Sequence, residues 1–356
     1  MNEAMSISVL SAIVLICLGV IAVADHSVSS FPLASLYVLP LTVCALIYPF
    51  RITFWLCFGC WLLHDFVSPF REAGPSQHLL RGGTTLMGYL VVVGVVSGLG
   101  SQRRRAAELA MKQRDELAAE IQLGAEVQQS ILPRSIPKIT GFEIAARMQP
   151  AKVIAGDYYG FIELNERETA VIIADVSGKG VAAGLLMPSI EIALEMEARQ
   201  TPETGVLLQS FNNVVHRVTG GRRFISLFYG KLCHRSKTLR YSNAGHNPPL
   251  LIRPTGEAVQ LAEGGPVLGV LPNAGYGSDA VLLCNGDVLV FFTDGLVEAE
   301  NEKSEEYSAR RLASLVRSKL NASATELLDE IFASVAEFQG PVAQSDDMTV
   351  AVLKVL

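Results

Sequence analysis

The sequence predicts an α+β domain that follows an all-α, four-helix transmembrane domain and a helical linker. The first hundred of the 356 residues contain four apolar stretches, whereas residues 103–132 are charged and rich in helix-forming Ala, Glu, Leu, Gln and Arg. After Gly141, runs of short apolar strands are interrupted by pairs of helical patterns, which indicates sheets inside and helices outside. We therefore expect three units: residues 1–100, 101–133 and 134–356.

Apolar residues are concentrated before residue 101. The chain is 50% hydrophobic and has a mean hydropathy of +0.34, which exceeds what one soluble domain needs. A membrane-spanning helix needs roughly 20 apolar residues. The candidate stretches are about residues 5–24, 33–49, 52–68 and 82–100.

The distribution of basic residues predicts the orientation of these spans. Arg103, Arg104 and Arg105 directly follow the last apolar stretch, whereas residues 25–32 contain no Lys or Arg. By the positive-inside rule both termini are cytoplasmic. We predict a multi-pass protein of the cytoplasmic (inner) membrane, with residues 1–100 acting as a sensor or anchor.

The remaining charge is mildly acidic. The first hundred residues hold only three of the 29 basic and four of the 35 acidic side chains, and the whole chain has a formal net charge of −6. That balance argues against a nucleic-acid partner. Two of the early ionisable residues, His64 and Asp65, lie near the end of the third apolar stretch. They are interpreted as interfacial, with an intramembrane functional pair as the alternative.

The linker carries an imperfect heptad pattern. Steps of four and three residues give the seam Ala110, Arg114, Leu117, Ile121, Gly124, Gln128 and Ile131. Two polar members and a glycine allow at best a weak coiled coil, so we expect a homodimer held by a marginal interface that a small bias could rearrange. A single helix packed on the following domain is the alternative. Pro133 and Pro137 end the helix.

Periodicity divides residues 142–356 into strands and helices. Helical patterns cover about residues 180–199, 203–218, 307–319 and 324–338. The candidate strands are residues 142–149, 157–163, 168–175, 223–232, 238–243, 249–253, 257–261, 279–284, 287–293 and 347–355.

Aspartates stand at the ends of several predicted strands. Asp175 follows the buried run 171–174, and the others are Asp157, Asp294 and the adjacent pair Asp346 and Asp347. A single aspartate before glycine is usually a turn residue. Several such sites in one domain favour a carboxylate cluster, which suits hard divalent cations such as Mg²⁺ and Mn²⁺. Spacing alone leaves a metal-dependent hydrolase and a set of turns as alternatives.

Five short motifs follow one another in the second half of the chain. They are Ala-Gly-Asp-Tyr-Tyr (155–159), Asp-Val-Ser-Gly-Lys-Gly (175–180), Ser-Asn-Ala-Gly-His-Asn-Pro-Pro (242–249), Phe-Thr-Asp-Gly-Leu-Val-Glu-Ala (292–299) and Ser-Asp-Asp-Met-Thr (345–349). Together they resemble the motifs of one family, the SpoIIE-type branch of the metal-dependent PPM serine/threonine phosphatases. The resemblance runs from about Glu126 to Leu356, with the motifs in the family's order.

The resemblance implies a PPM-type β-sandwich with helices on both faces and two Mn²⁺ or Mg²⁺ ions at one rim. Asp175 would bridge the ions, with the Val176 carbonyl as a further ligand. Asp157 would hold the second ion, and Asp294 and Asp346 the first. These four aspartates would be the catalytic residues, because a water held by two cations supplies the nucleophile. Asp347 is the less favoured ligand of the adjacent pair, since relatives in the wider superfamily can carry Asn there. Because side chains alternate along a strand, only one of the two aspartates should face the site.

The resemblance also implies a substrate, namely phosphoserine or phosphothreonine on a STAS-domain protein, an anti-sigma-factor antagonist. The membrane domain would control the activity through the linker. A non-catalytic receptor that keeps the fold to bind a partner is the alternative, and retention of all four aspartates favours the enzyme. His246 is interpreted as a residue that orders its turn, with a general acid as the other possibility. A histidine kinase would need a histidine in residues 101–140, which contain none.

Overall fold

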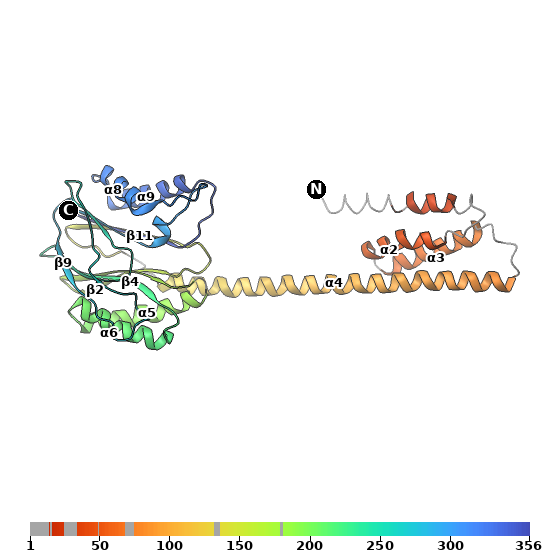
Figure 1. Cartoon of the computed structure of the whole chain (residues 1–356), viewed down its shortest axis with the longest axis horizontal. Coiled ribbons are helices and arrows are strands. Elements are labelled where there is room, and N and C mark those ends of the chain that lie inside the picture. Colours follow the sequence, from red (N-terminus) through yellow and green to blue (C-terminus); the bar gives the residue numbers. More distant parts are fainter. Residues whose placement is uncertain are drawn as a thin grey trace. The chain divides into compact units, whose positions relative to one another are not determined.

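The computed structural model describes residues 14, 16–24, 34–48, 50–67, 75–131, 136–178 and 181–356 (Figure 1). The chain divides into two compact units, Met1–Glu116 and Leu117–Leu356. The predicted boundary between membrane domain and linker lies at residue 100, so the first unit includes half of the predicted linker.

The N-terminal unit is helical. A 3₁₀ turn, Ala34–Tyr37, leads into α2 (Val38–Ile47), followed by α3 (Phe50–Val67) and the first part of α4 (Pro75–Ile131). Its core contains Tyr37, Leu41, Cys44, Cys57, Tyr89 and Val93. Large apolar side chains also point outward, among them Leu39, Trp55, Val91 and Leu99. An apolar surround would accommodate such a surface.

The predicted number of membrane spans stays a prediction. Among the described residues, one helix, Gly83–Glu126, is long and apolar enough to cross a membrane. Helix α2 has only 10 residues and covers about 15 Å, half the hydrocarbon thickness. Half of the first predicted span lies outside the described residues, although 14 and 16–24 are helical. The fourth predicted span and the linker form one continuous helix, α4.

The C-terminal unit is the predicted α+β sandwich. One sheet has the strand order β1-β11-β10-β6-β7, and the other has the order β2-β3-β4-β5-β8, with β9 paired to β5. The bounds are β1 Phe142–Gln149, β2 Asp157–Asn165, β3 Glu168–Val176, β4 Ile225–Cys233, β5 Thr238–Ala244, β6 Leu250–Ile252, β7 Ala258–Gln260, β8 Gly264–Gly265, β9 Asp279–Leu282, β10 Val288–Phe292 and β11 Met348–Val355.

Helices cover the outer face of each sheet (Figure 1). The hairpin of α5 (Val181–Gln200) and α6 (Thr204–Thr219) packs on β2–β5, while α8 (Ser308–Ser318) and α9 (Ala324–Gln339) pack on the other sheet. Between the sheets lies an apolar core that includes Ile173, Phe228, Leu289, Phe291 and Leu353. The short helix α7 (Asp294–Val297) was not predicted.

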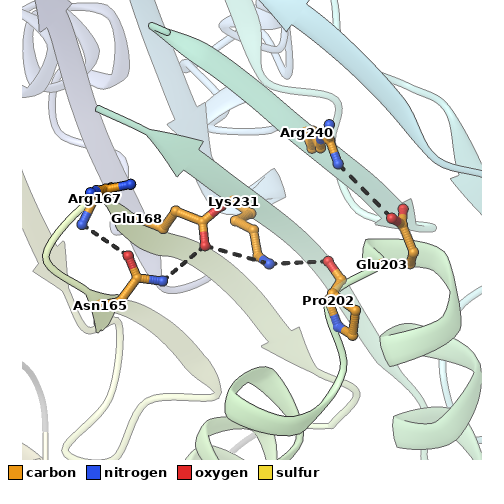
Figure 2. Close-up of polar contacts among 7 residues, drawn as sticks. All are labelled: Asn165, Arg167, Glu168, Pro202, Glu203, Lys231 and Arg240. Carbon is orange, nitrogen blue, oxygen red and sulfur yellow. Dashed lines mark hydrogen bonds and ion pairs between the residues drawn. The ribbon is translucent and has the colours of Figure 1, made fainter. Parts of the chain in front are cut away.

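The turn between α5 and α6 is fixed to the sheet by charged side chains (Figure 2). Lys231 on β4 is 12% exposed; its Nζ donates to the Pro202 carbonyl at 3.1 Å and lies 3.9 Å from Glu168. Arg240 on β5 pairs with Glu203 at 3.9 Å. The charged end of Lys231 is therefore satisfied although it is largely buried, and this end of the helical hairpin is attached to both strands.

Candidate metal centre

Two of the predicted ligands are brought together by strand pairing. Asp157 begins β2 and is the register partner of Asp175, near the end of the antiparallel strand β3. Directly opposite residues of an antiparallel pair project to the same face of the sheet, with Cβ atoms about 4.5–5.5 Å apart. Asp157 is only 3% exposed, whereas Asp175 is half-buried.

Residues of the other sheet hold the Asp157 carboxylate. Its Oδ2 accepts hydrogen bonds from Thr293 Oγ1 at 2.8 Å and from Thr349 Oγ1 at 2.6 Å. Thr293 directly precedes Asp294, and Thr349 follows the Asp346–Asp347 pair. Neither threonine was predicted as a site residue, although both lie inside the motifs Phe-Thr-Asp-Gly and Asp-Asp-Met-Thr.

The adjacent aspartates have different environments, and both precede β11, which begins at Met348. Asp347 is 8% exposed, and its carboxylate accepts the backbone N–H groups of Ala151 at 2.8 Å and Gly156 at 2.6 Å. It therefore fixes the loop that leads into Asp157. Asp346 is half-buried and more accessible, and it accepts the backbone N–H of Asp347 at 3.0 Å.

Glycines allow the motif backbones to approach one another. A Cβ added at Gly295 would lie 2.1 Å from the Asp347 carbonyl oxygen, so the turn that carries Asp294 sits against the Asp346–Asp347 backbone. A Cβ at Gly156 would lie 3.2 Å from the Val176 carbonyl oxygen and 3.4 Å from Asp175 Oδ1. The four aspartate-bearing motifs therefore meet at one rim of the sandwich.

The rim is electrostatically suited to a cation. Burial, followed by the charge of Asp175, raises the pKa of Asp157 well above its usual range, and the two threonine hydroxyls offset part of that shift. None of the ion pairs among the described residues involves Asp157. Carboxylate oxygens in such a setting fit the donor preference of Mg²⁺ and Mn²⁺.

The aspartate side chains at the rim do not form a complete set of metal ligands in this structure. In the part of the chain that the structure describes, no group of three His, Cys, Asp or Glu side chains stands ready to hold a metal ion. The structure brings Asp157 opposite Asp175 and brings the Asp294 and Asp346 backbones together. The assignment of all four aspartates and of Val176 as ligands stays a prediction.

His246 orders the neighbouring turn. Its backbone N–H donates to Asn243 Oδ1 at 2.7 Å, the Asn243 side chain donates back to the His246 carbonyl, and Nδ1 contacts Ser226 Oγ at 2.8 Å. Nε2 is buried near the Phe292 backbone without a well-formed hydrogen bond. Burial lowers the pKa of His246 to about 4, so the ring is neutral at pH 7 and unsuited to donate a proton as a general acid.

The end of α4 contacts the loop before Asp157. The buried Gln128 side chain donates to the Ala155 carbonyl at 2.6 Å and accepts the Ala155 N–H at 3.0 Å. A Cβ added at Gly124 would lie 3.4 Å from Ile154 Cδ1. Gln128, a member of the heptad seam, makes these contacts within its own domain. The alternative of a helix packed on the following domain describes this end of the linker.

The fold resembles solved phosphatase structures of the PP2C type. The PP2C domain of SiaA from Pseudomonas aeruginosa superposes with a TM-score of 0.62 at 19% identity, covering 68% of this chain and 99% of that one. The RsbU and RsbW domains of Rv1364c from Mycobacterium tuberculosis give 0.54 at 24% identity, covering 63% and 62%. The fold is thus the one found in PP2C-type phosphatase domains.

Sequence comparison identifies the family. Residues 165–356 match the family of Stage II sporulation protein E (SpoIIE). The chain is 31% identical over 244 residues to the phosphoserine phosphatase RsbU of Bacillus subtilis (strain 168), covering 67% of this chain and 71% of RsbU. Protein IcfG of Synechocystis sp. is 26% identical over 257 residues, and the match covers 65% of this chain and 40% of IcfG. The chain belongs to the SpoIIE family, as its motifs predicted.

Proposed function

We propose that this chain is a membrane-anchored phosphatase that removes phosphate from phosphoserine or phosphothreonine on a STAS-type anti-sigma-factor antagonist. The observation that carries the proposal is the pairing of Asp157 with Asp175 at the rim where the other aspartate motifs meet. The name of RsbU supports a phosphoserine substrate. The joined RsbU and RsbW domains of the M. tuberculosis protein support a role in signalling between proteins.

Each aspartate has a proposed role at the rim. Asp157 would hold the second ion and Asp294 and Asp346 the first, with Asp175 as a ligand shared by both and the Val176 carbonyl as a further ligand. Two Mn²⁺ or Mg²⁺ ions would neutralise the phosphate and lower the pKa of a bound water. The protein's own contribution is to orient these oxygens: Thr293 and Thr349 fix the Asp157 carboxylate, and Asp347 fixes the loop before it.

The contact between Gln128 and Ala155 supports control through the linker. Ala155 lies two residues before Asp157, so a shift of the end of α4 would act on the approach to a proposed ligand. Gly184, early in α5, is also close, since a Cβ there would lie 3.3 Å from Gln128 Nε2. We propose that residues 1–100 form the membrane domain, that 101–133 transmit its signal in a homodimer, and that 134–356 are the phosphatase domain.

The alternative function is a receptor that uses the fold only to bind a partner. The two functions are separated by assaying the full chain, in detergent or nanodiscs, for phosphate release from a phosphoserine protein with added Mn²⁺ and with a chelator. The phosphatase requires release that depends on the metal. Binding of the phosphoprotein without release in either condition would favour the receptor.

A further inference from the structure

We propose that a cavity beside the Asp175 turn docks the segment next to the substrate's phosphoserine, and that Arg222 selects an acidic side chain there. The inference deepens the proposed function and rests on it. It concerns recognition of the protein substrate, which the aspartates at the rim do not explain.

The cavity adjoins the proposed metal site. It has a volume of about 630 Å³ and is lined by Ser177, Gly178, Leu186, Val218, Thr219, Arg222 and Arg223. Ser177 and Gly178 directly follow Asp175 and Val176, so the cavity begins two residues from a proposed ligand. A volume of this size accommodates one or two side chains of a bound segment.

Hydrogen bonds fix the arginine-bearing loop to the Asp175 turn. Ser177 N–H donates to the Phe224 carbonyl at 2.9 Å, and Phe224 N–H donates to Ser177 Oγ at 2.8 Å. Arg223 Nη1 donates to the Ser177 carbonyl at 3.0 Å. Gly178 has a φ of +93°, a conformation that favours glycine, and a Cβ there would lie 2.6 Å from the movable Arg223 Nη1. These hydrogen bonds therefore fix the position of the loop that carries Arg222 and Arg223 relative to the Asp175 turn.

Arg222 is the arginine available to a ligand. The Arg223 guanidinium already contacts Ser177, whereas the Arg222 side chain is exposed. Arg222 takes part in none of the ion pairs among the described residues. It lies on a phosphatase domain that is otherwise mildly acidic, so a positive charge at this position would offset the repulsion of an acidic substrate.

The lining determines the chemistry of the ligand. Both charged residues among the described lining are arginines, and no carboxylate is among them. A guanidinium binds carboxylates in a bidentate manner. Leu186 and Val218 supply apolar surface in the same cavity. The matching ligand is a peptide segment with an acidic and an apolar side chain close to the phosphoserine, while the phosphate itself goes to the aspartate rim.

The test compares two phosphoserine peptides that differ only in one flanking residue, Glu or Gln, next to a leucine. The full chain is assayed in nanodiscs with Mn²⁺. Arg222→Glu should raise KM for the Glu peptide about tenfold, leave kcat within about twofold, and change KM for the Gln peptide less than about twofold. Arg222→Lys should restore most of the preference, because it keeps the charge.

Arg217→Glu provides the matched control, since it makes the same charge reversal at an exposed arginine in the last turn of α6 that does not line the cavity. Equal changes in KM for both peptides, or the same effect from the control, would overturn the docking role and leave the phosphatase function standing. If the unmodified chain hydrolyses neither peptide, the proposed function fails, and the docking proposal fails with it.

Discussion

Asp157 on β2 lies directly opposite Asp175 on β3, and hydroxyls from the opposite sheet reach the Asp157 carboxylate. A single buried side chain thus joins the two sheets at the rim where the aspartate motifs meet. The threonines orient this carboxylate without neutralising it. Burial and the neighbouring Asp175 disfavour its charged form, which a cation bound at this rim would stabilise.

The two threonines should contribute to stability as well as to metal affinity. Replacing Thr293 or Thr349 with Val removes a hydrogen bond to a buried carboxylate and should lower the free energy of unfolding by about 1.5–3 kcal/mol. The measurement is urea unfolding of residues 117–356, the compact unit. Thr238→Val, on β5 away from the rim, serves as the control and should change stability little. Unchanged stability in both rim variants would show that the hydroxyls do not support Asp157.

Asp346 and Asp347 should separate activity from stability. Asp347→Ala removes the acceptor for two backbone N–H groups and should destabilise the domain by about 2–3 kcal/mol. Asp346→Asn should leave stability nearly unchanged but should raise the Mn²⁺ concentration needed for phosphatase activity. Unfolding curves and Mn²⁺ titrations of both variants check this. The reverse pattern would mean that Asp346 supports the loop and Asp347 the metal.

His246 should make the domain less stable in mild acid. Its pKa is lowered to about 4 in the fold, below the ordinary value of 6.5, so the unfolded chain binds the proton more readily. The stability contribution is complete above pH 6.5 and is lost as the pH falls towards 4, by on the order of 3 kcal/mol. His246→Gln should flatten the dependence of unfolding free energy on pH between 7 and 5. His234→Gln, in contact with Thr169, should leave that slope in place.

Gln128 and Arg114 should have separable effects, although the heptad pattern groups them. Gln128→Leu removes the hydrogen bonds to Ala155 and should shift the Mn²⁺ dependence of activity without strengthening dimerisation. Arg114→Leu adds an apolar group at an exposed seam position and should strengthen dimerisation, at about 0.8 kcal/mol per buried methylene. Sedimentation and Mn²⁺ titration of each variant make the comparison. Coinciding Mn²⁺ curves for Gln128→Leu and the unmodified chain would mean that the contact is only structural.

Local signals predicted the helices and strands well. Thr201 and Pro202 directly follow the last residue of α5, Gln200, and Ser323 and Glu326 form a capping box at the start of α9. The end of α5 and the start of α9 are therefore determined by neighbouring residues. Strand β8 and helix α7 were not predicted. Both elements depend on contacts with residues that are distant in the sequence. Strand β8 pairs with β5, and α7 packs against the backbone of Asp347.

The candidate site was predicted in part for the same reason. Sequence motifs singled out Asp157 and Asp175, whereas the choice between Asp346 and Asp347 as a ligand stays a prediction, because both residues precede β11. The roles of Thr293, Thr349 and Gln128 could not be predicted, since each acts on a residue more than 25 positions away. Such contacts result from the packing of the two sheets and of α4, and local sequence patterns do not predict that packing.

The most direct measurement of the central claim is the effect of Mn²⁺ on the chain and on its Asp175→Asn variant. Thermal unfolding and phosphoserine hydrolysis are followed together, with Asp329→Asn as the control because Asp329 is an exposed aspartate on α9. The account predicts that Mn²⁺ raises the unfolding temperature and supports hydrolysis in the unmodified and control proteins, and that Asp175→Asn abolishes both effects. Hydrolysis by Asp175→Asn at the unmodified rate would contradict the proposed metal centre.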